Sequence, residues 1–134
     1  MTGLQFEHDF CKWLQNRGYW ALNIPRAKTG AQPFDVIAMR GHFVLCADCK
    51  VVSSQARRFA LERVEDNQWL AMQSCRDKTG AFCVFAVFHV VTNQLFLIPY
   101  IRIEDAKKAG DASIELTAEY LADRLLPKME RYLW

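Results

Sequence analysis

The stretch PFDVIAMRGHFVLCADCKVV, residues 33–52, decides the fold because two apolar runs flank a single glycine-containing turn. Residues 34–39 and 42–52 are rich in the branched and aromatic side chains that favour strands. Arg40-Gly41 between them supplies the backbone freedom that a tight hairpin turn needs. We therefore expect an antiparallel hairpin turning on Arg40-Gly41, with Asp35 opposite Cys46 and diagonal to Asp48.

Side chains alternate across a strand, so the predicted hairpin has two chemically different faces. One face is wholly apolar and is expected to be core: Phe34, Val36, Ala38, Phe43, Leu45, Ala47 and Cys49. The other face carries two aspartates and a lysine among its members: Asp35, Ile37, Met39, His42, Val44, Cys46, Asp48 and Lys50. Diagonal neighbours on such a pair lie roughly 7 Å apart, so we expect the aspartates to converge at one end of the sheet.

Two carboxylates beside a lysine form the kind of oxygen-rich site that suits Mg²⁺ or Mn²⁺. Such an ion acidifies water and neutralises charge on phosphate oxygens, and Lys50 would hold the water or the phosphate. Glu7 lies between apolar positions of a predicted helix, where an inward carboxylate needs a cation or hydrogen-bond donors, so it is the candidate third acid. Gln68, at the border of a second apolar stripe, is a candidate supporting residue.

The remaining pattern extends this hairpin into an α/β domain. Helical spacing of apolar residues predicts helices over 4–17, 64–78 and 116–133, the last broken by Pro127. Strand-like runs cover 19–24, 81–91 and 94–100. The expected order is α-β-β-β-α-β-β-α, a mixed central sheet flanked by helices, in one domain spanning 1–134.

Composition narrows the class of protein. A chain of 134 residues that is 51% hydrophobic can bury one compact core. Its longest apolar stretch, 81–91, is shorter than the ~20 residues of a membrane span, and residues 1–8 do not resemble a secretory signal, so we expect a cytoplasmic protein. Five cysteines, an odd number, favour reduced thiols over a disulfide framework.

The net charge of +2 does not by itself indicate nucleic-acid binding, which depends on local basic clusters. Six residues are candidate DNA contacts: Arg26, Lys28, Thr29, Arg57, Arg58 and Arg63. Each basic residue taken singly is nearly as well explained as part of a solvated face. Likewise an Asp-x-Lys tripeptide alone is usually a solvated strand edge. A zinc site at Cys46 and Cys49 is disfavoured because residues three apart on a strand face opposite sides.

Pro33-Phe34-Asp35 followed by Asp48-Cys49-Lys50 resembles the PD-(D/E)xK nuclease motif, with aspartate in place of the commoner glutamate. The upstream Glu7 and the run 59–72, which includes Asn67-Gln68, are similar to RecU-type and archaeal Holliday junction resolvases.

This resemblance implies a restriction-endonuclease-like fold and a Mg²⁺-dependent endonuclease acting on branched DNA as a homodimer. It implies a catalytic set of Glu7, Asp35, Asp48 and Lys50, supported by Gln68, with the three acids holding the metal. RecU-type proteins carry a long stalk before the first catalytic aspartate, whereas a short loop separates Ile24 from Asp35 here. A nuclease for linear or nicked DNA and a catalytically silent nucleic-acid-binding module therefore stay open.

Overall fold

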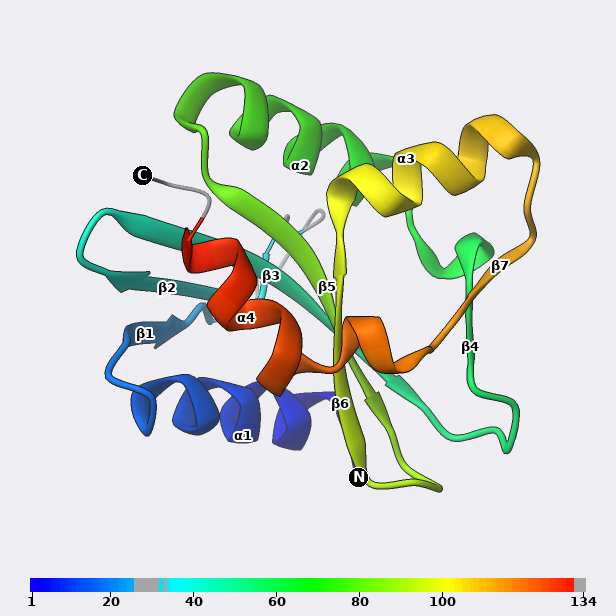
Figure 1. Ribbon diagram of the computed structural model, residues 1–134, viewed down its shortest axis with the longest axis horizontal. Helices are drawn as coiled ribbons and strands as arrows, with labels where there is room; N and C mark the ends of the chain where they lie inside the picture. The colour runs from blue at the N-terminus through cyan, green and yellow to red at the C-terminus, as the bar shows by residue number, and fades with distance from the viewer. Residues whose placement is uncertain (26–31, 33, 132–134) are drawn as a thin grey trace.

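A five-stranded mixed sheet forms the centre of the computed structural model, which describes residues 1–25, 32 and 34–131 (Figure 1). Its strand order is β1-β2-β3-β5-β6. Strands β3 and β5 run parallel, and the other neighbouring strands run antiparallel. The strands are β1 (Trp20–Asn23), β2 (Val36–Arg40), β3 (Phe43–Val52), β5 (Phe82–His89) and β6 (Gln94–Pro99).

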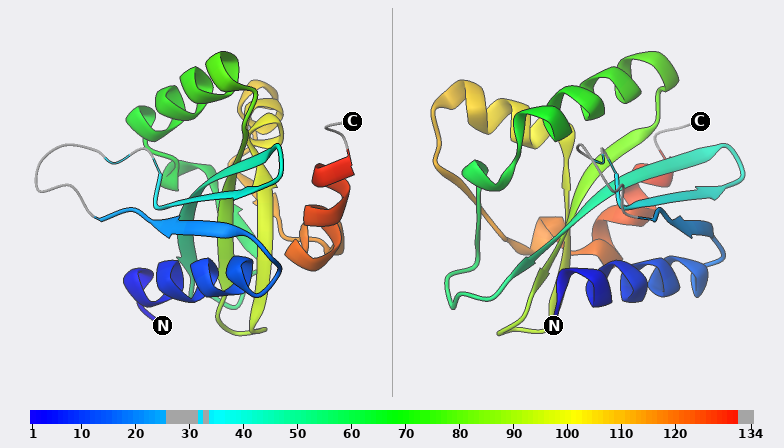
Figure 2. Two further views of the ribbon diagram at one scale, coloured as in Figure 1. Left: turned by 90° about the vertical axis from the view of Figure 1, so that its left-hand side faces the viewer. Right: turned by 180° about the vertical axis from the view of Figure 1, so that it is seen from behind.

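Helices cover both faces of this sheet (Figure 2). α1 (Gly3–Gln15) and α4 (Ala122–Arg131) pack on one face, and α2 (Asp66–Thr79) and α3 (Tyr100–Ala109) pack on the other. Strands β3 and β5 lie between the two layers and are buried on both sides, which explains their nearly continuous apolar sequence. In the described part of the chain, no helix is both long and apolar enough to cross a bilayer.

The hairpin turn lies one residue later than the sequence predicts. Arg40 pairs with Phe43 and Val36 pairs with Ala47, so the turn residues are Gly41 and His42, with Gly41 at a φ of +60°. The predicted pairing of Asp35 with Cys46 is therefore wrong by two residues. Because side chains alternate with a period of two, an even slip leaves each residue of the paired strands on its predicted face.

Most of the predicted core face is confirmed. Six of its seven residues pack with α1 and α4: Val36, Ala38, Phe43, Leu45, Ala47 and Cys49. Phe34 is the exception, because it precedes β2 and joins the core on the α2 side. The strand alternation that governs the others does not extend to it.

Several elements differ from the prediction. Residues 101–115, for which the sequence predicts no element, contain most of α3 and the short strand β7 (Ser113–Glu115). β7 pairs with β4 (Arg58–Ala60) in a second sheet. Two 3-10 turns, Leu61–Arg63 and Ala118–Tyr120, flank these elements. The predicted tail helix begins only at Ala122, and it continues through Pro127 instead of breaking there.

Leu14 is the residue with which we test the packing of α1 against the sheet. It is fully buried, whereas Leu4 on the same helix is 58% exposed. We expect Leu14→Ala to lower the free energy of unfolding by about 2–5 kcal/mol because it leaves a cavity. Leu4→Ala, the matched control, should change it by less than about 0.5 kcal/mol. Urea denaturation measures both, and equal effects would contradict this packing.

Candidate active site

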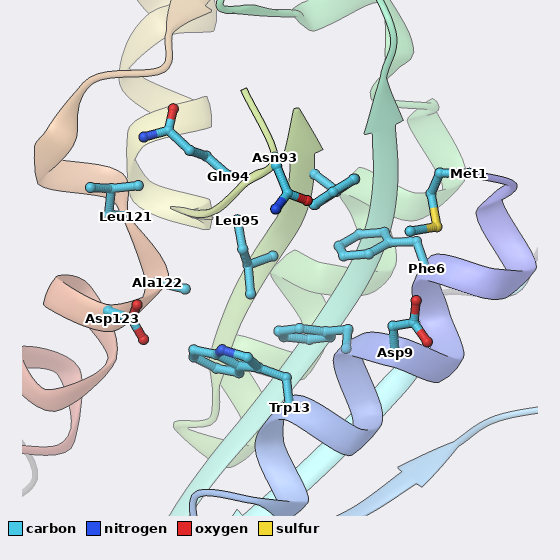
Figure 3. A pocket seen from close by; sticks show the side chains of 12 residues that line it. Met1, Phe6, Asp9, Trp13, Asn93, Gln94, Leu95, Leu121, Ala122 and Asp123 are labelled. Carbon is cyan, nitrogen blue, oxygen red and sulfur yellow. The ribbon is translucent and has the colours of Figure 1, made fainter. Parts of the chain in front are cut away.

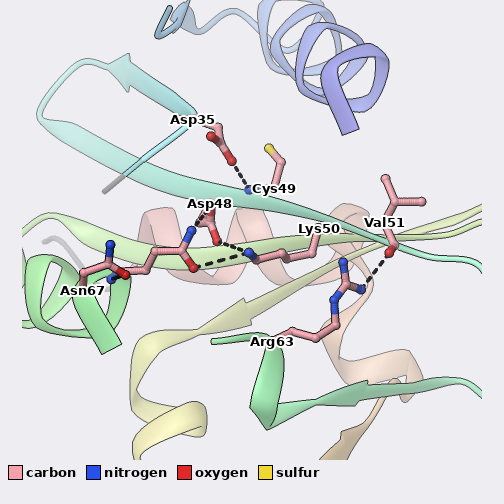
Figure 4. A network of polar contacts seen from close by, with 8 residues as sticks. Asp35, Asp48, Cys49, Lys50, Val51, Arg63 and Asn67 are labelled. Carbon is pink, nitrogen blue, oxygen red and sulfur yellow. Dashed lines mark hydrogen bonds and ion pairs between the residues drawn. The ribbon is translucent and has the colours of Figure 1, made fainter. Parts of the chain in front are cut away.

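Asp48 lies in the middle of β3 with its side chain on the α2 face, where it is only 2% exposed. Lys50, two residues along the same strand face, places its Nζ 3.3 Å from Oδ2 of Asp48. Gln68 Nε2 donates to Asp48 Oδ1 at 3.4 Å, and Lys50 Nζ donates to Gln68 Oε1 at 3.3 Å. These contacts form a closed network that joins β3 to α2 (Figure 4).

Gln68 stands in the first turn of α2, from which its side chain contacts both Asp48 and Lys50 of β3. Its backbone N–H donates to the side chain of Asn67 at 2.9 Å, one of the contacts that satisfy an amide at a helix start. Gln68 is itself buried. The sequence-predicted supporting residue thus lies at the predicted site, and it contacts both Asp48 and Lys50.

Asp35 is held in place just before β2 by backbone contacts on both sides. Its N–H donates to the carbonyl of Ala47 at 2.9 Å, and its carbonyl accepts the N–H of Ile24 at 2.8 Å. Its Oδ2 accepts the backbone N–H of Cys49 at 2.8 Å. The regular β2–β3 ladder ends at Val36, because Asp35 donates to Ala47, the residue that already pairs with Val36. Asp35 is nevertheless close enough to Asp48 to influence its pKa.

The pKa of Asp48 is raised mainly because its carboxylate is buried away from water. Burial, followed by a hydrogen bond with Asp35 and the charge of Asp35, raises the pKa of Asp48 to about 8, although Lys50 acts to lower it. Oδ2 of Asp48 is buried and has no hydrogen-bond partner, since its contact with Lys50 is an ion pair outside hydrogen-bonding geometry. Burial therefore disfavours the ionised form of Asp48, and a bound cation would favour it.

These residues fit a hard divalent cation by their chemistry. Asp35 and Asp48 supply carboxylate oxygens, and Oδ2 of Asp48, which has no hydrogen-bond partner, is available as a metal ligand. Among the described residues, no group of three or more His, Cys, Asp or Glu side chains is arranged to hold a metal. A cation held by the two aspartates would need further oxygens, which water, backbone carbonyls or a substrate phosphate can provide.

Glu7 is buried on α1, which packs on the opposite face of β3 from α2. Its charge reaches the strand: burial raises the pKa of the Cys49 thiol well above its ordinary value, and the charges of Asp35, Asp48 and Glu7 add to that effect. The structure therefore places Glu7 near Cys49, but not in one metal-binding group with Asp35 and Asp48. Its part in metal binding stays a prediction.

The predicted DNA contacts divide into three sets. Arg63 is exposed and lies at the Lys50 end of the network, where its Nη1 donates to the carbonyl of Val51 at 2.7 Å (Figure 4). Arg57 and Arg58 are exposed and contact Gln94 and Ser113, respectively, outside the network. Arg26, Lys28 and Thr29, like Pro33 of the motif, lie outside the described residues.

A cavity of about 530 Å³ opens elsewhere, between α1, the start of α4 and the turn between β5 and β6 (Figure 3). Phe6, Trp13 and Leu95 are among its lining residues, with Asp9 and Asp123 at its edge. None of Asp35, Asp48, Lys50 and Gln68 lines it. It is therefore separate from the candidate active site.

The cysteines form a group that the sequence did not reveal. Cys46 and Cys49 lie in cores on opposite faces of β3, as predicted, so they do not converge. Cys46 instead has its Sγ 4.0 Å from that of Cys75 on α2, and it pairs with Cys83 on β5. Three separate elements contribute these residues, so no sequence spacing signals the group.

Comparison with known proteins identifies the fold of this chain through similarity of structure and not of sequence. No family model matches this sequence, and no curated protein sequence matches it. Among solved structures 25 chains match, including the 1.6 Å structure of Hjc from Archaeoglobus fulgidus, a Holliday junction resolvase from an archaeal hyperthermophile. The TM-score is 0.60 at 18% identity, over 74% of this chain and 78% of that chain. The predicted restriction-endonuclease-like fold is confirmed.

The raised pKa of Asp48 predicts how stability depends on pH. The unfolded chain releases this proton near the ordinary value of 3.8, whereas the folded protein keeps it to about 8. Between these values the folded state binds more protons, so stability falls as pH rises. We expect the thermal midpoint of metal-free protein to fall over this interval, and Mg²⁺ to raise it more at its upper end than at its lower end.

Asp48→Asn should remove both effects, because an amide does not titrate and holds a cation poorly. Asp77→Asn, a change at an exposed carboxylate on α2, is the matched control and should retain them. Differential scanning calorimetry across the interval, with and without Mg²⁺, makes the measurement. A pH response in Asp48→Asn equal to that of the natural sequence would show that another group is responsible.

Proposed function

We propose that this chain is a divalent-metal-dependent DNA endonuclease that hydrolyses phosphodiester bonds in branched DNA. The observation that carries the proposal is the burial of Asp48 beside Asp35 and Lys50 on a confirmed restriction-endonuclease-like sheet. Burying a carboxylate destabilises a fold unless it is paired or bound to a metal. A structural role at this position would be filled better by an apolar side chain, so a functional role explains the residue.

Each residue of the network has a distinct role under this proposal. Asp35 and Asp48 would hold Mg²⁺ or Mn²⁺, with Glu7 as the proposed third acid. A cation bound there would supply a Lewis acid for the phosphate and a more acidic water. Lys50, held by Gln68 and Asp48, would donate to a phosphate oxygen or to the attacking water. Gln68 would act as a positioning residue because it fixes both.

The proposed substrate follows from the fold neighbour and from the basic residues around the site. The Archaeoglobus protein is a Holliday junction resolvase, and this likeness supports branched DNA as the substrate class. Arg63 would contact a backbone phosphate near Lys50. We propose Arg26, Lys28, Thr29, Arg57 and Arg58 as further phosphate contacts.

Two competing functions are separable by experiment. A nuclease of the same fold that acts on linear or nicked DNA is compatible with the short connection between Ile24 and Asp35. A silent nucleic-acid-binding module would bind DNA without cleaving it. The intact network of Asp35, Asp48, Lys50 and Gln68 favours turnover over the silent module.

We expect Asp48→Ala and Lys50→Ala to lower cleavage by at least about 100-fold, because each removes charge stabilisation at the reacting phosphate. DNA binding should be largely kept in both variants. Labelled four-way junction, linear duplex, nicked duplex and single-stranded DNA, incubated with and without Mg²⁺ or Mn²⁺, provide the measurement. Lys78→Ala, which alters an exposed lysine at the end of α2, is the control and should cleave normally.

The substrate panel also distinguishes the alternatives. Faster cleavage of the four-way junction than of either duplex supports the branched-DNA proposal. Faster cleavage of linear or nicked duplex would contradict it and support the first alternative. Binding without cleavage under all metal conditions would favour the silent module. Full activity in Asp48→Ala or Lys50→Ala would refute the assignment of the site.

We further propose that the protein acts as a homodimer, because two cuts on opposing strands require two active sites. An exposed apolar patch supports an interface at the β1 edge of the sheet: Trp20 is 60%, Leu22 46% and Met39 43% exposed. Trp20 pairs with Met39, and Leu22 follows on the same strand face. An isologous contact through such a patch is the common form of a symmetric dimer.

Trp20→Ser is expected to shift the protein toward monomer by removing the largest exposed ring of this patch. Sedimentation velocity should report a species of about twice 15.5 kDa for the natural sequence and a larger monomer fraction for the variant. Leu70→Ser, which changes an equally exposed apolar residue on α2, should leave the distribution unchanged. A natural sequence that stays monomeric at high concentration would contradict the dimer.

A further inference from the structure

Three cysteines from three different elements meet beneath α2. Cys46 on β3 and Cys83 on β5 are paired neighbours on adjacent parallel strands, and both are buried in the α2-side core. Cys75 on α2 packs against this core with its Sγ 4.0 Å from that of Cys46. Cys11 and Cys49 lie in or beside the core on the opposite face. The thiols of Cys46, Cys75 and Cys83 are therefore separated from the other two by the sheet.

We propose that Cys46 and Cys75 form a modification site, at which a peroxide closes a reversible disulfide between β3 and α2. Their sulfur atoms already touch, and one of the two residues is accessible: Cys75 is only partly buried, while Cys46 and Cys83 are buried. A disulfide needs a sulfur separation of about 2.05 Å, so the sulfurs must approach by roughly 2 Å.

The reaction balances with the peroxide as oxidant. The Cys75 sulfur attacks one peroxide oxygen, which breaks the O–O bond and yields a sulfenic acid and one water or alcohol. The Cys46 sulfur then attacks the sulfenic sulfur, forms the S–S bond and releases water. Two thiols lose two protons and two electrons in total, and the peroxide accepts both electrons.

Cys46 is a better partner for Cys75 than Cys83 is. The Cys46 Sγ to Cys75 Sγ contact joins a strand to a helix, whose side chain can rotate toward the strand. The thiol of Cys83 donates to the carbonyl of Ala81, 3.9 Å away in its own chain segment, and it also lies close enough to Cys46 and Cys75 for both to raise its pKa. Cys75 also contacts Thr79, so its sulfur sits at the accessible end of α2.

The location of this pair links oxidation to the candidate active site, and this step alone rests on the proposed nuclease function. Cys46 precedes Asp48 by two residues on the same face of β3, and Cys75 follows Gln68 by seven residues, about two turns, on α2. A disulfide would thus connect the same two elements that the Gln68–Asp48 contact connects. Drawing the sulfurs together would move α2 and disturb that contact.

Peptide mapping of the full chain after hydrogen peroxide treatment tests the site without relying on nuclease activity. Trypsin places Cys75 in residues 64–76, but it leaves Cys46 and Cys49 together in residues 41–50. A second protease that cuts before Asp48 separates them. We expect one linked pair of peptides carrying Cys46 and Cys75, lighter by two hydrogens, and loss of two of the five titratable thiols. Dithiothreitol should restore all five.

Variants make the assignment specific. Cys75→Ser should abolish the linked peptide and keep four free thiols, whereas Cys11→Ser, a change on the opposite face, should still form it. Cys83→Ser should also form it, and Cys75→Ala takes the place of Cys75→Ser if that variant is unstable. A Cys75–Cys83 link, or conversion of Cys75 to sulfinic acid with no link, would overturn the proposal.

A separate cleavage assay on junction DNA, before and after oxidation, tests the coupling. Reduced activity that returns with dithiothreitol in the natural sequence, and that does not occur in Cys75→Ser, supports it. Unchanged activity in protein shown to be linked would refute the coupling while the disulfide site stands. If no substrate is cleaved even when reduced, the proposed function fails independently of the mapping result.

Discussion

The candidate site depends on one constraint, the burial of the Asp48 carboxylate between β3 and α2. A carboxylate without water needs donors, a proton or a cation, and Gln68 and Lys50 supply only part of what it needs. Oδ2 of Asp48 has no hydrogen-bond partner, and burial raises the pKa of Asp48 to about 8. The apolar layers on both sides of β3 cause this burial, because they keep solvent away from the strand. The fold and the chemistry of the site therefore have the same cause.

The sequence predicts correctly which face of β3 carries Asp48 and Lys50, because a two-residue error in register leaves every side chain on the same face. The sequence predicts a turn at Arg40-Gly41, whereas the turn lies at Gly41-His42. Both dipeptides contain Gly41, the residue with a positive φ, so the sequence pattern does not distinguish them. The resulting slip is even, so Asp48 and Lys50 lie on their predicted face. The predicted common face does not extend to Asp35, which precedes β2 and lies on the Cys49 side of β3 (Figure 4). A slip of odd parity would have moved Asp48 to the α1 side. The position of Asp35, whose N–H donates to Ala47 outside the regular ladder, does not follow from alternation.

Other features were beyond the reach of a single sequence. The strands β4 and β7 have three residues each, which is too short for alternation to show, and their pairing joins segments about 55 residues apart. In α3 only Tyr100, Ile103 and Ala106 are buried, a stripe too narrow to stand out among charged residues. Pro127 lies within α4 because tertiary packing of Leu126 and Met129 outweighs its local preference. The cysteine group depends on contacts among three elements.

Asp35 connects the two sides of β3, and this gives the site its asymmetry. Its carboxylate accepts the N–H of Cys49, whose side chain packs on the α1 side, and its proximity helps to raise the pKa of Asp48, whose side chain contacts α2. Burial raises the pKa of Asp48 and of the Cys49 thiol, and the charge of Asp35 adds to both shifts. A cation at Asp35 would therefore offset the repulsion that Asp35 exerts both on Asp48, on the α2 side of β3, and on the Cys49 thiol, on the α1 side.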